Sequence, residues 1–328
     1  MQKITSSTII LFAVTFFLTL ATWADQTQTE TTSVVKTADV APAIPKWKMN
    51  LMSYYYDIKG HKAADSQAYD FDAINTRLDL MNVSYTINPS WTLNLLVQHY
   101  EFYTETIFPK FAGTAYAKSF DRTEGLGDTY LTLITPITFA GSWLVLGDFG
   151  VSLPTGTIRN KSNLPGLQDY DLAYNAQHGS GTYDALAAVT ALYMQPKYLF
   201  GVRASSSTRF GKNTNDYTLG NLYRADSWLD YNAGFGLTPR AVGYYRHKEA
   251  INGFDKNRGE IPDDEFYRHA QIDWNVCAAL KYQYDFSKVT PMSVAVEGGI
   301  PVAQGSNNVD HSDVTTNYYT SISLTGSF

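Results

Sequence analysis

Residues 270–286 read AQIDWNVCAALKYQYDF, and this stretch decides the fold. Alternate residues from Ile272 to Phe286 are apolar, and the residues between them are mostly polar or charged, as at Asp273 and Lys281. Because successive side chains of a β-strand point to opposite faces, the pattern predicts a strand with one apolar and one polar face. The alternation is long for a soluble sandwich and suits a strand that crosses a bilayer around a wet interior. Taken alone, the segment leaves both interpretations open.

The composition narrows the class of protein. Of the 328 residues, 17% are charged and 14% are aromatic, with 24 Tyr and 17 Phe. Tyrosine enrichment fits the aromatic belts at the two interfaces of membrane proteins. The formal net charge is −6 without a run of basic residues, so we expect no nucleic-acid partner. Cys277 is the single cysteine of the sequence and the spacings of metal-binding Cys and His are absent, so we expect no disulfide, metal or cofactor.

The N-terminus carries an export signal. Lys3 precedes the apolar run 9–20 and small residues up to Ala24, which predicts a signal peptide over residues 1–24 and export by the Sec route. Residues 25–46, rich in Thr, Gln and Ala, lack periodicity and are predicted to be a flexible periplasmic lead-in. No later apolar run is long enough for a helical span, so residues 47–328 are either a soluble domain or a barrel.

From residue 47 onward, alternating segments are followed by turn signals. One irregularity is that Leu78 and Leu80 keep one phase whereas Met81 and Val83 keep the other, and we interpret this switch as a bulge near residue 80. Twelve strands are predicted in total, at 47–58, 74–87, 91–103, 125–137, 143–154, 183–195, 198–210, 227–238, 241–248, 268–286, 292–302 and 316–328.

The connections between these strands fall into two classes. After even-numbered strands they are short, as at residues 88–90, 196–197 and 239–240, and after odd-numbered strands they run about 13 to 28 residues. Short periplasmic turns alternating with long outer loops are typical of bacterial outer-membrane barrels, and an even strand number places both termini in the periplasm. The sequence therefore predicts an all-β fold, a transmembrane antiparallel β-barrel of twelve strands in the bacterial outer membrane, in contact with its lipids.

The last predicted strand ends in Phe328. A terminal Phe on an alternating strand resembles the C-terminal signature of outer-membrane proteins, although Gly326 departs from it. The resemblance implies that the barrel assembly machinery is a partner.

Three motifs occur in a fixed order: GLGDTYLTL at 125–133, GVSLPTGT at 150–157 and GSGTYD at 179–184. Over residues 47–328 their order and spacing resemble the outer-membrane family of transporters assigned to a MetA pathway of phenol degradation. The resemblance implies a passive channel for small molecules, aromatic or hydrophobic compounds among them. Glycine and proline also end strands and allow tight turns, so we expect these motifs to be strand-boundary devices rather than a binding site.

Polar residues on one face of each strand are predicted to line the lumen. Because twelve strands enclose less space than the 16–18 of general porins, loop 155–182 is predicted to narrow the bore. A solvated outer loop is the alternative for that segment. The lumen candidates are Asp148, Arg203, Arg209, Asp230, Asp273, Lys281, Asp285 and Glu297, and the loop candidates for contact with a small-molecule solute are Asp169, Tyr170, Asp171, Tyr174 and His178.

His178 and Ser180 form a His-x-Ser pair, which raises the possibility of a lipase-type barrel enzyme. Ser activation needs a hydrogen-bonded His and a third group that orients it. Outer-membrane phospholipases carry the pair within a strand, with an orienting Asn about a dozen residues later, whereas position 192 here is Leu. We therefore predict a channel without catalytic residues. A structural or surface-binding barrel is the alternative, and a hydrolase is the less favoured one.

Overall fold

The computed structural model describes residues 46–60, 70–108, 117–161, 171, 174, 177–255, 271–287, 292–308 and 314–327. The predicted signal peptide, all but the last residue of the predicted lead-in, and Phe328 lie outside the described residues. The regular elements in the described ranges are all β-strands, and no helix there is long and apolar enough to cross a membrane.

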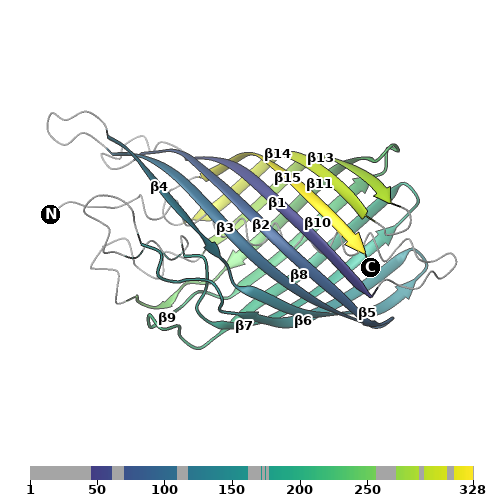
Figure 1. Cartoon of the computed structure of the whole chain (residues 1–328), viewed down its shortest axis with the longest axis horizontal. Coiled ribbons are helices and arrows are strands. Elements are labelled where there is room, and N and C mark those ends of the chain that lie inside the picture. The colour runs from purple at the N-terminus through teal and green to yellow at the C-terminus, as the bar shows by residue number, and fades with distance from the viewer. Residues whose placement is uncertain are drawn as a thin grey trace.

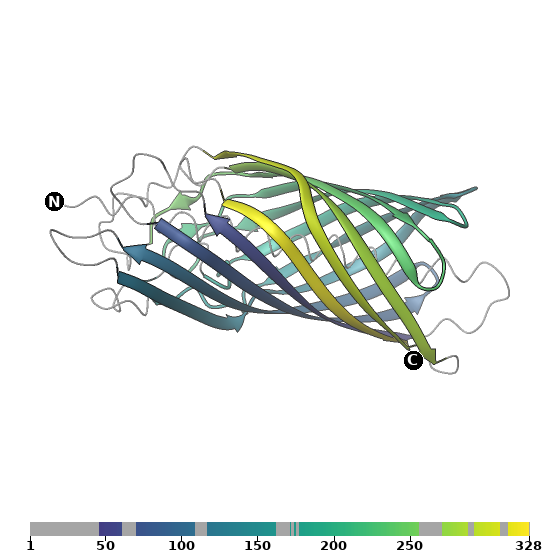
Figure 2. The ribbon, with the colours of Figure 1, turned by 90° about the horizontal axis from the view of Figure 1, so that it is seen from above.

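The strands form one closed antiparallel barrel (Figures 1 and 2). Neighbours run in the order β2-β1-β15-β14-β13-β11-β10-β8-β7-β6-β5-β3-β4, and the pairing of β2 with β3 closes the ring. β4 and β5 pair with different parts of β3 and together occupy one place in the ring. The thirteen strands of the ring therefore fill the predicted twelve places. The strands are β1 Trp47–Gly60, β2 Asp70–Asn88, β3 Trp91–Phe108, β4 Ala117–Leu126, β5 Thr129–Ala140, β6 Trp143–Leu153, β7 Tyr183–Met194, β8 Tyr198–Phe210, β10 Leu222–Tyr231, β11 Leu237–Lys248, β13 Gln271–Ser287, β14 Met292–Asn308 and β15 Val314–Ser327.

The two ends of the barrel differ. Residues 89–90, 141–142, 195–197 and 232–236 make brief connections at one end, here called the short-turn end. The opposite, long-loop end carries the 154–182 connection and a small sheet of β9 (Tyr217–Thr218) and β12 (Asn252–Gly253).

Strand β13 confirms the two predicted faces. Trp274, Val276 and Leu280 are exposed on the outside, whereas Asp273 and Asn275 are buried in the interior. In a closed barrel the buried set of alternate residues points inward, so each strand's inner face can be identified from burial.

The β10–β11 hairpin differs from the prediction. Strands at 227–238 and 241–248 with a turn at 239–240 are wrong, because β10 ends at Tyr231 and β11 begins at Leu237. Gly234, Phe235 and Gly236 have φ of 88°, 53° and 79°, a conformation that suits a tight turn rather than a strand. A Cβ at Gly236 would lie 2.1 Å from the Gln283 carbonyl oxygen. The apparent alternation of apolar residues therefore continued through a turn.

The predicted bulge near residue 80 is also wrong. The β1–β2 register runs unbroken from the Trp47–Tyr85 pair to the Ile58–Ile74 pair, and the β2–β3 shifts lie at the ends of β2. Leu78 and Leu80 both point inward and are buried, with 0% and 3% exposure. The switch of phase arises because the interior itself is apolar at this height.

Several strands are longer than predicted at the long-loop end, and the predicted fourth strand at 125–137 begins earlier, at Ala117, and is broken into β4 and β5. β2 has 19 residues and β3 has 18, more than the ~9–11 that a bilayer crossing requires. The outer faces of these strands change from apolar to charged at Met81, Val97 and Leu126. Toward the long-loop end the outward residues are then Arg77, Asp79, Glu101, Arg122 and Glu124, joined in ion pairs, and His99, whose Nδ1 lies 3.8 Å from the Asp79 carboxylate.

Candidate functional site

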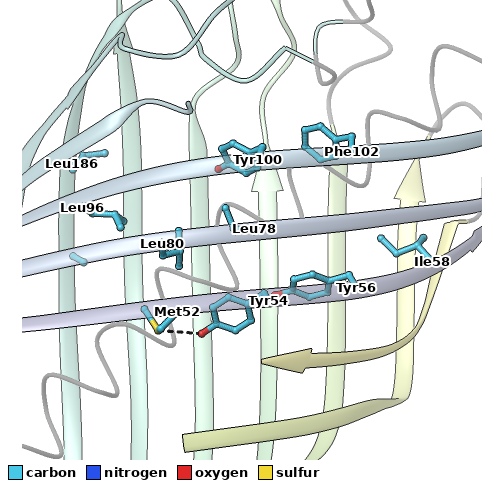
Figure 3. Close-up of a cluster of buried hydrophobic side chains, with 11 residues drawn as sticks. Met52, Tyr54, Tyr56, Ile58, Leu78, Leu80, Leu96, Tyr100, Phe102 and Leu186 are labelled. Carbon is cyan, nitrogen blue, oxygen red and sulfur yellow. Dashed lines mark hydrogen bonds between the residues drawn. The ribbon is translucent and has the colours of Figure 1, made fainter. Parts of the chain in front are cut away.

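The interior surface of β1–β3 is apolar and aromatic (Figure 3). Tyr54 and Tyr56 stack at 6.1 Å between ring centroids, and Tyr100 and Phe102 stack at 5.7 Å. No charged side chain faces inward within 50–58, 76–84 or 94–102. We call this surface the apolar wall; it consists of Met52, Tyr54, Tyr56, Ile58, Leu78, Leu80, Leu96, Tyr100 and Phe102.

The opposite side of the interior carries the charges. Counted around the ring, β8, β10 and β11 each lie six positions from β1, β2 and β3, and therefore across the barrel from them. The buried cations of the described residues all lie on these three strands: Arg203, Arg209, Arg224, Arg240, Arg246 and Lys248.

The arginines of this side are paired with carboxylates, because a buried charge is costly without a partner. Together they form the ion-pair wall. Its salt bridges are Arg203–Asp148 at 2.5 Å, Arg209–Asp184 at 3.0 Å, Arg224–Asp226 at 2.5 Å, Arg240–Asp230 and Arg240–Glu297 at 2.8 Å each, and Arg246–Asp273.

Most of the predicted lumen residues belong to this wall, namely Asp148, Arg203, Arg209, Asp230, Asp273 and Glu297. Lys281 is half-buried on the inward register of β13, opposite Glu297 on β14. Asp285 is exposed near the short-turn end, where its carboxylate accepts a hydrogen bond from Gln283, so it lies away from the wall.

Sequence reasoning missed five arginine and aspartate positions of the wall and its lysine. Arg224 and Asp226 lay outside the predicted strand at 227–238, although Tyr223, Ala225 and Ser227 alternate with them. Arg240 was assigned to a turn, and Arg246 to the predicted strand at 241–248 without a role in the lumen. Extending the alternation of β10 toward its N-terminal end would have found two of them. The missed residues are Asp184, Arg224, Asp226, Arg240, Arg246 and Lys248.

The three glycine-rich motifs meet at one point of the barrel wall. Asp128 lies in the break between β4 and β5, and its carboxylate accepts bonds from the backbone of Gly156 at 3.0 Å and of Ser180 at 2.8 Å. The Ser180 hydroxyl donates a third bond at 2.7 Å. Asp128 therefore fixes both ends of the 154–182 connection, an arrangement we call the Asp128 clamp.

Close backbone contacts explain the glycines of this clamp. A Cβ on Gly156 would lie 2.6 Å from the Cα of Gly179, and a Cβ on Gly179 would lie 2.4 Å from the carbonyl oxygen of Gly156. The two strands of the loop thus approach more closely than any side chain allows. The motifs act here as strand-boundary and loop-anchoring devices.

The structure describes three of the five predicted loop residues, and they lie in different surroundings. Asp169 and Tyr170 lie outside the described residues. The backbone of Asp171 pairs with that of Lys161 in an isolated antiparallel β-bridge, and Tyr174 packs against Tyr217 at 4.6 Å between ring centroids. With Leu219 and Ile251 these two tyrosines form a separate buried cluster of the long-loop end.

His178 alone of the described loop candidates reaches the apolar wall. Its imidazole stacks on Tyr100 at 6.1 Å and on Phe102 at 5.7 Å, and the residue is 5% exposed. Burial, and secondarily the nearby His99, lowers the pKa of His178 to about 4. The ring is therefore neutral at pH 7.

The contacts of Ser180 differ from those of a catalytic serine. Its hydroxyl donates to Asp128, and neither ring nitrogen of His178 has a hydrogen-bond partner among the described residues. The serine is thus held by a carboxylate without the histidine that activation requires. In the described part of the chain, no group of three His, Cys, Asp or Glu side chains could hold a metal ion.

The comparisons with known proteins agree with the fold. No protein-family model matches the sequence, and no curated protein matches it. Among solved structures, the chain is similar to the COG4313 outer membrane channel from Pseudomonas putida F1, with 11% identity, a TM-score of 0.56, and coverage of 88% of this chain and 100% of that one. A Pseudomonas aeruginosa FadL homologue matches at 12% identity and a TM-score of 0.39, covering 86% of this chain and 90% of that one.

At 11% identity the likeness to the Pseudomonas putida channel shows the barrel fold alone. The resemblance to the MetA-pathway family, the removal of a signal peptide, and the binding of the C-terminal strand by the assembly machinery all stay predictions.

Proposed function

We propose that this protein is an outer-membrane channel that passively passes small molecules with an aromatic or hydrophobic part. The observation that carries the proposal is the two-sided interior, in which an uncharged aromatic wall faces a wall of paired charges. In this proposal the ring of a solute lies against the aromatic wall while its polar substituents face the ion pairs. Binding sites for small molecules commonly combine such apolar surface with a few placed polar groups.

The outer surface supports residence in a bilayer. Outward rings pair between neighbouring strands near the short-turn end, as at Trp47–Tyr85, Trp143–Tyr193 and Tyr198–Tyr231. Toward the long-loop end Tyr55 pairs with Tyr318. Exposed apolar residues such as Val202, Val276 and Leu280 lie between these levels. Aromatic belts around an apolar band are the outer surface of transmembrane barrels.

A vesicle-swelling assay tests the proposal. We expect vesicles that contain the refolded chain to admit phenylalanine faster than glutamine. The two amino acids share the same amino and carboxyl groups, but only phenylalanine has an aromatic ring that can lie against the apolar wall. Replacing Tyr54 and Tyr56 together by Ser should abolish that preference. Tyr55→Ser is the matched control, since Tyr55 lies between them but points outward. Folded protein that admits neither solute would contradict the channel.

A surface-binding barrel is the second candidate, and it is favoured by the hydrogen bonds that connect the loops at the long-loop end. The loops there interlock: Asn215 donates to Asp255 at 3.0 Å, and the backbone of Asp255 donates to the hydroxyl of Tyr174 at 3.0 Å. A barrel of this second kind would show no flux, and its partner binding would be lost on deletion within loop 155–182 while mutations of the ion-pair wall left it intact.

A further inference from the structure

The ring of His178 occupies a slot lined by aromatic side chains. Tyr100 and Phe102 lie nearly parallel to the imidazole, with interplanar angles of 12° and 26° and centroid distances of 6.1 and 5.7 Å. Gly125 closes the slot on another side, where an added Cβ would lie 2.7 Å from the Nδ1 atom of His178. The slot is thus shaped to a flat ring.

The chemistry of the slot fits the imidazole poorly. Both ring nitrogens of His178 are buried without a hydrogen-bond partner among the described residues, which costs free energy relative to an imidazole in water. The hydroxyl of Thr76, a residue with 0% exposure, is likewise unpartnered among them. In the β1–β2–β3 register Thr76 lies between Tyr56 and Phe102, directly within the apolar wall.

The shape of the slot suits a flat ring, but its chemistry suits a ring other than the imidazole of His178. We propose that the Tyr100–Phe102 slot is a stacking site for the planar aromatic ring of a solute, and that His178 occupies it as an internal ligand that the solute ring displaces. The inference rests on the proposed channel function and names one step of passage. When no solute is bound, His178 fills the slot, and this contact holds the loop against the apolar wall.

Self-occupancy has a quantitative consequence. A solute can bind only in the fraction of molecules whose slot is free, so a stack that fills nine-tenths of them weakens the apparent affinity about tenfold. Removing the imidazole should restore that factor. A ring without unpaired nitrogens should instead hold the slot more tightly.

Equilibrium dialysis of indole against the full chain in detergent measures this directly. We expect His178→Ala to bind indole about tenfold more tightly than the unmodified protein. Gly125→Ala should instead weaken indole binding, because its methyl group fills the space in which either ring stacks. His178→Phe should weaken binding. His99→Ala, on the outward face of the same strand, is the matched control and should leave it unchanged.

Equal indole affinity in all four variants and the unmodified protein would overturn the inference, as would tighter binding by His178→Phe. Folding of each variant is checked by the heat-dependent shift of barrel mobility in electrophoresis, and Gly125→Ala keeps the test intact if His178→Ala fails to fold. Swelling by phenylalanine is measured on the same preparations. Flux together with the same indole affinity in every variant would contradict the stacking site but not the channel. Absence of flux in every preparation would contradict the channel.

Discussion

At the scale of single residues, the barrel interior places paired charges opposite side chains that carry none. Asp184 shows how completely one such charge is compensated: it accepts bonds from Arg209 at 3.0 Å and from Thr182 at 2.8 Å. Arg209 in turn donates to the Gly220 carbonyl at 3.1 Å. The pair therefore links β7, β8 and the following loop, and each partner depends on the other.

Removing one charge of this pair should cost more than removing both. We expect Asp184→Asn to lower the free energy of unfolding by about 3–5 kcal/mol, because it leaves the Arg209 guanidinium buried without its carboxylate. The double change Asp184→Leu with Arg209→Met should recover most of that loss. Denaturant titration of the barrel in detergent measures both. A double variant no more stable than the single one would show that the pair is not the cause.

The His178 stack should depend on pH. Its pKa of about 4 lies below the ordinary 6.5, so protonation favours the undocked loop. Docking is then fully stable above pH 6.5 and weakens as the pH falls toward 4. His99 on β3 acts electrostatically on the ring and Tyr100 stacks on it, while the Asp128 carboxylate of the clamp accepts bonds from Gly156 and Ser180.

Hydrogen exchange measures this dependence. The amides of residues 177–182, corrected for intrinsic rates, should lose protection between pH 6.5 and 4 in the unmodified protein. His178→Phe should lose less protection over the same interval, since its ring does not titrate and only the Asp128 carboxylate, which accepts from the Ser180 amide, still can. The same loss in both proteins would assign the effect to another group.

At the scale of elements, the break between β4 and β5 converts a strand into an anchor. Gln98 donates to the Asp128 carbonyl at 2.9 Å and holds the broken strand to β3, while the carboxylate of Asp128 faces the loop. Thr155 adds a bond to the Gly127 carbonyl at 2.9 Å. Both ends of the loop are therefore bonded to the same residue, Asp128.

The Asp128 clamp predicts a local effect of mutation. Asp128→Asn keeps the shape but replaces charge-assisted acceptance from three donors by weaker bonds, which should destabilise loop docking by about 1–3 kcal/mol. Limited proteolysis within residues 154–182 should speed up while the barrel itself stays folded. Asp79→Asn, outward on β2, is the matched control. Unchanged cleavage would contradict the clamp.

These elements show where sequence patterns succeed and fail. Alternation located the long strands, because a two-residue period survives wherever lipid and interior differ in polarity. It failed at residues 233–237, where glycines of a turn happened to alternate with apolar residues, and at Leu78–Met81, where both faces are apolar. The clamp escaped prediction because its partners are separated by 28 and 52 positions, and no local pattern reports such contacts.

At the scale of the whole molecule, position around the ring decides what the interior is. The charged lumen candidates were identified from their strands, but which wall they would share could not be inferred, since it requires the closed order of strands. The apolar wall could not be inferred either, because the pattern predicted polar residues on the inner face of every strand. Closure brings β1–β3 opposite β8, β10 and β11, and the two-sided interior follows from that arrangement.

The same closure fixes which residues meet lipid, and this gives the last prediction. Leu280 on β13 is 49% exposed on the outer surface, and its neighbour Lys281 lies on the inward register. Leu280→Lys should destabilise the barrel folded in lipid vesicles by about 2–4 kcal/mol, because it places a charge in hydrocarbon. Lys281→Gln should change stability by less than about 1 kcal/mol, since that side chain is partly solvated. Denaturant titration in vesicles compares the two. If the inward variant were the more damaging one, the assignment of the two faces would be reversed, and with it the identity of the surface that a solute meets.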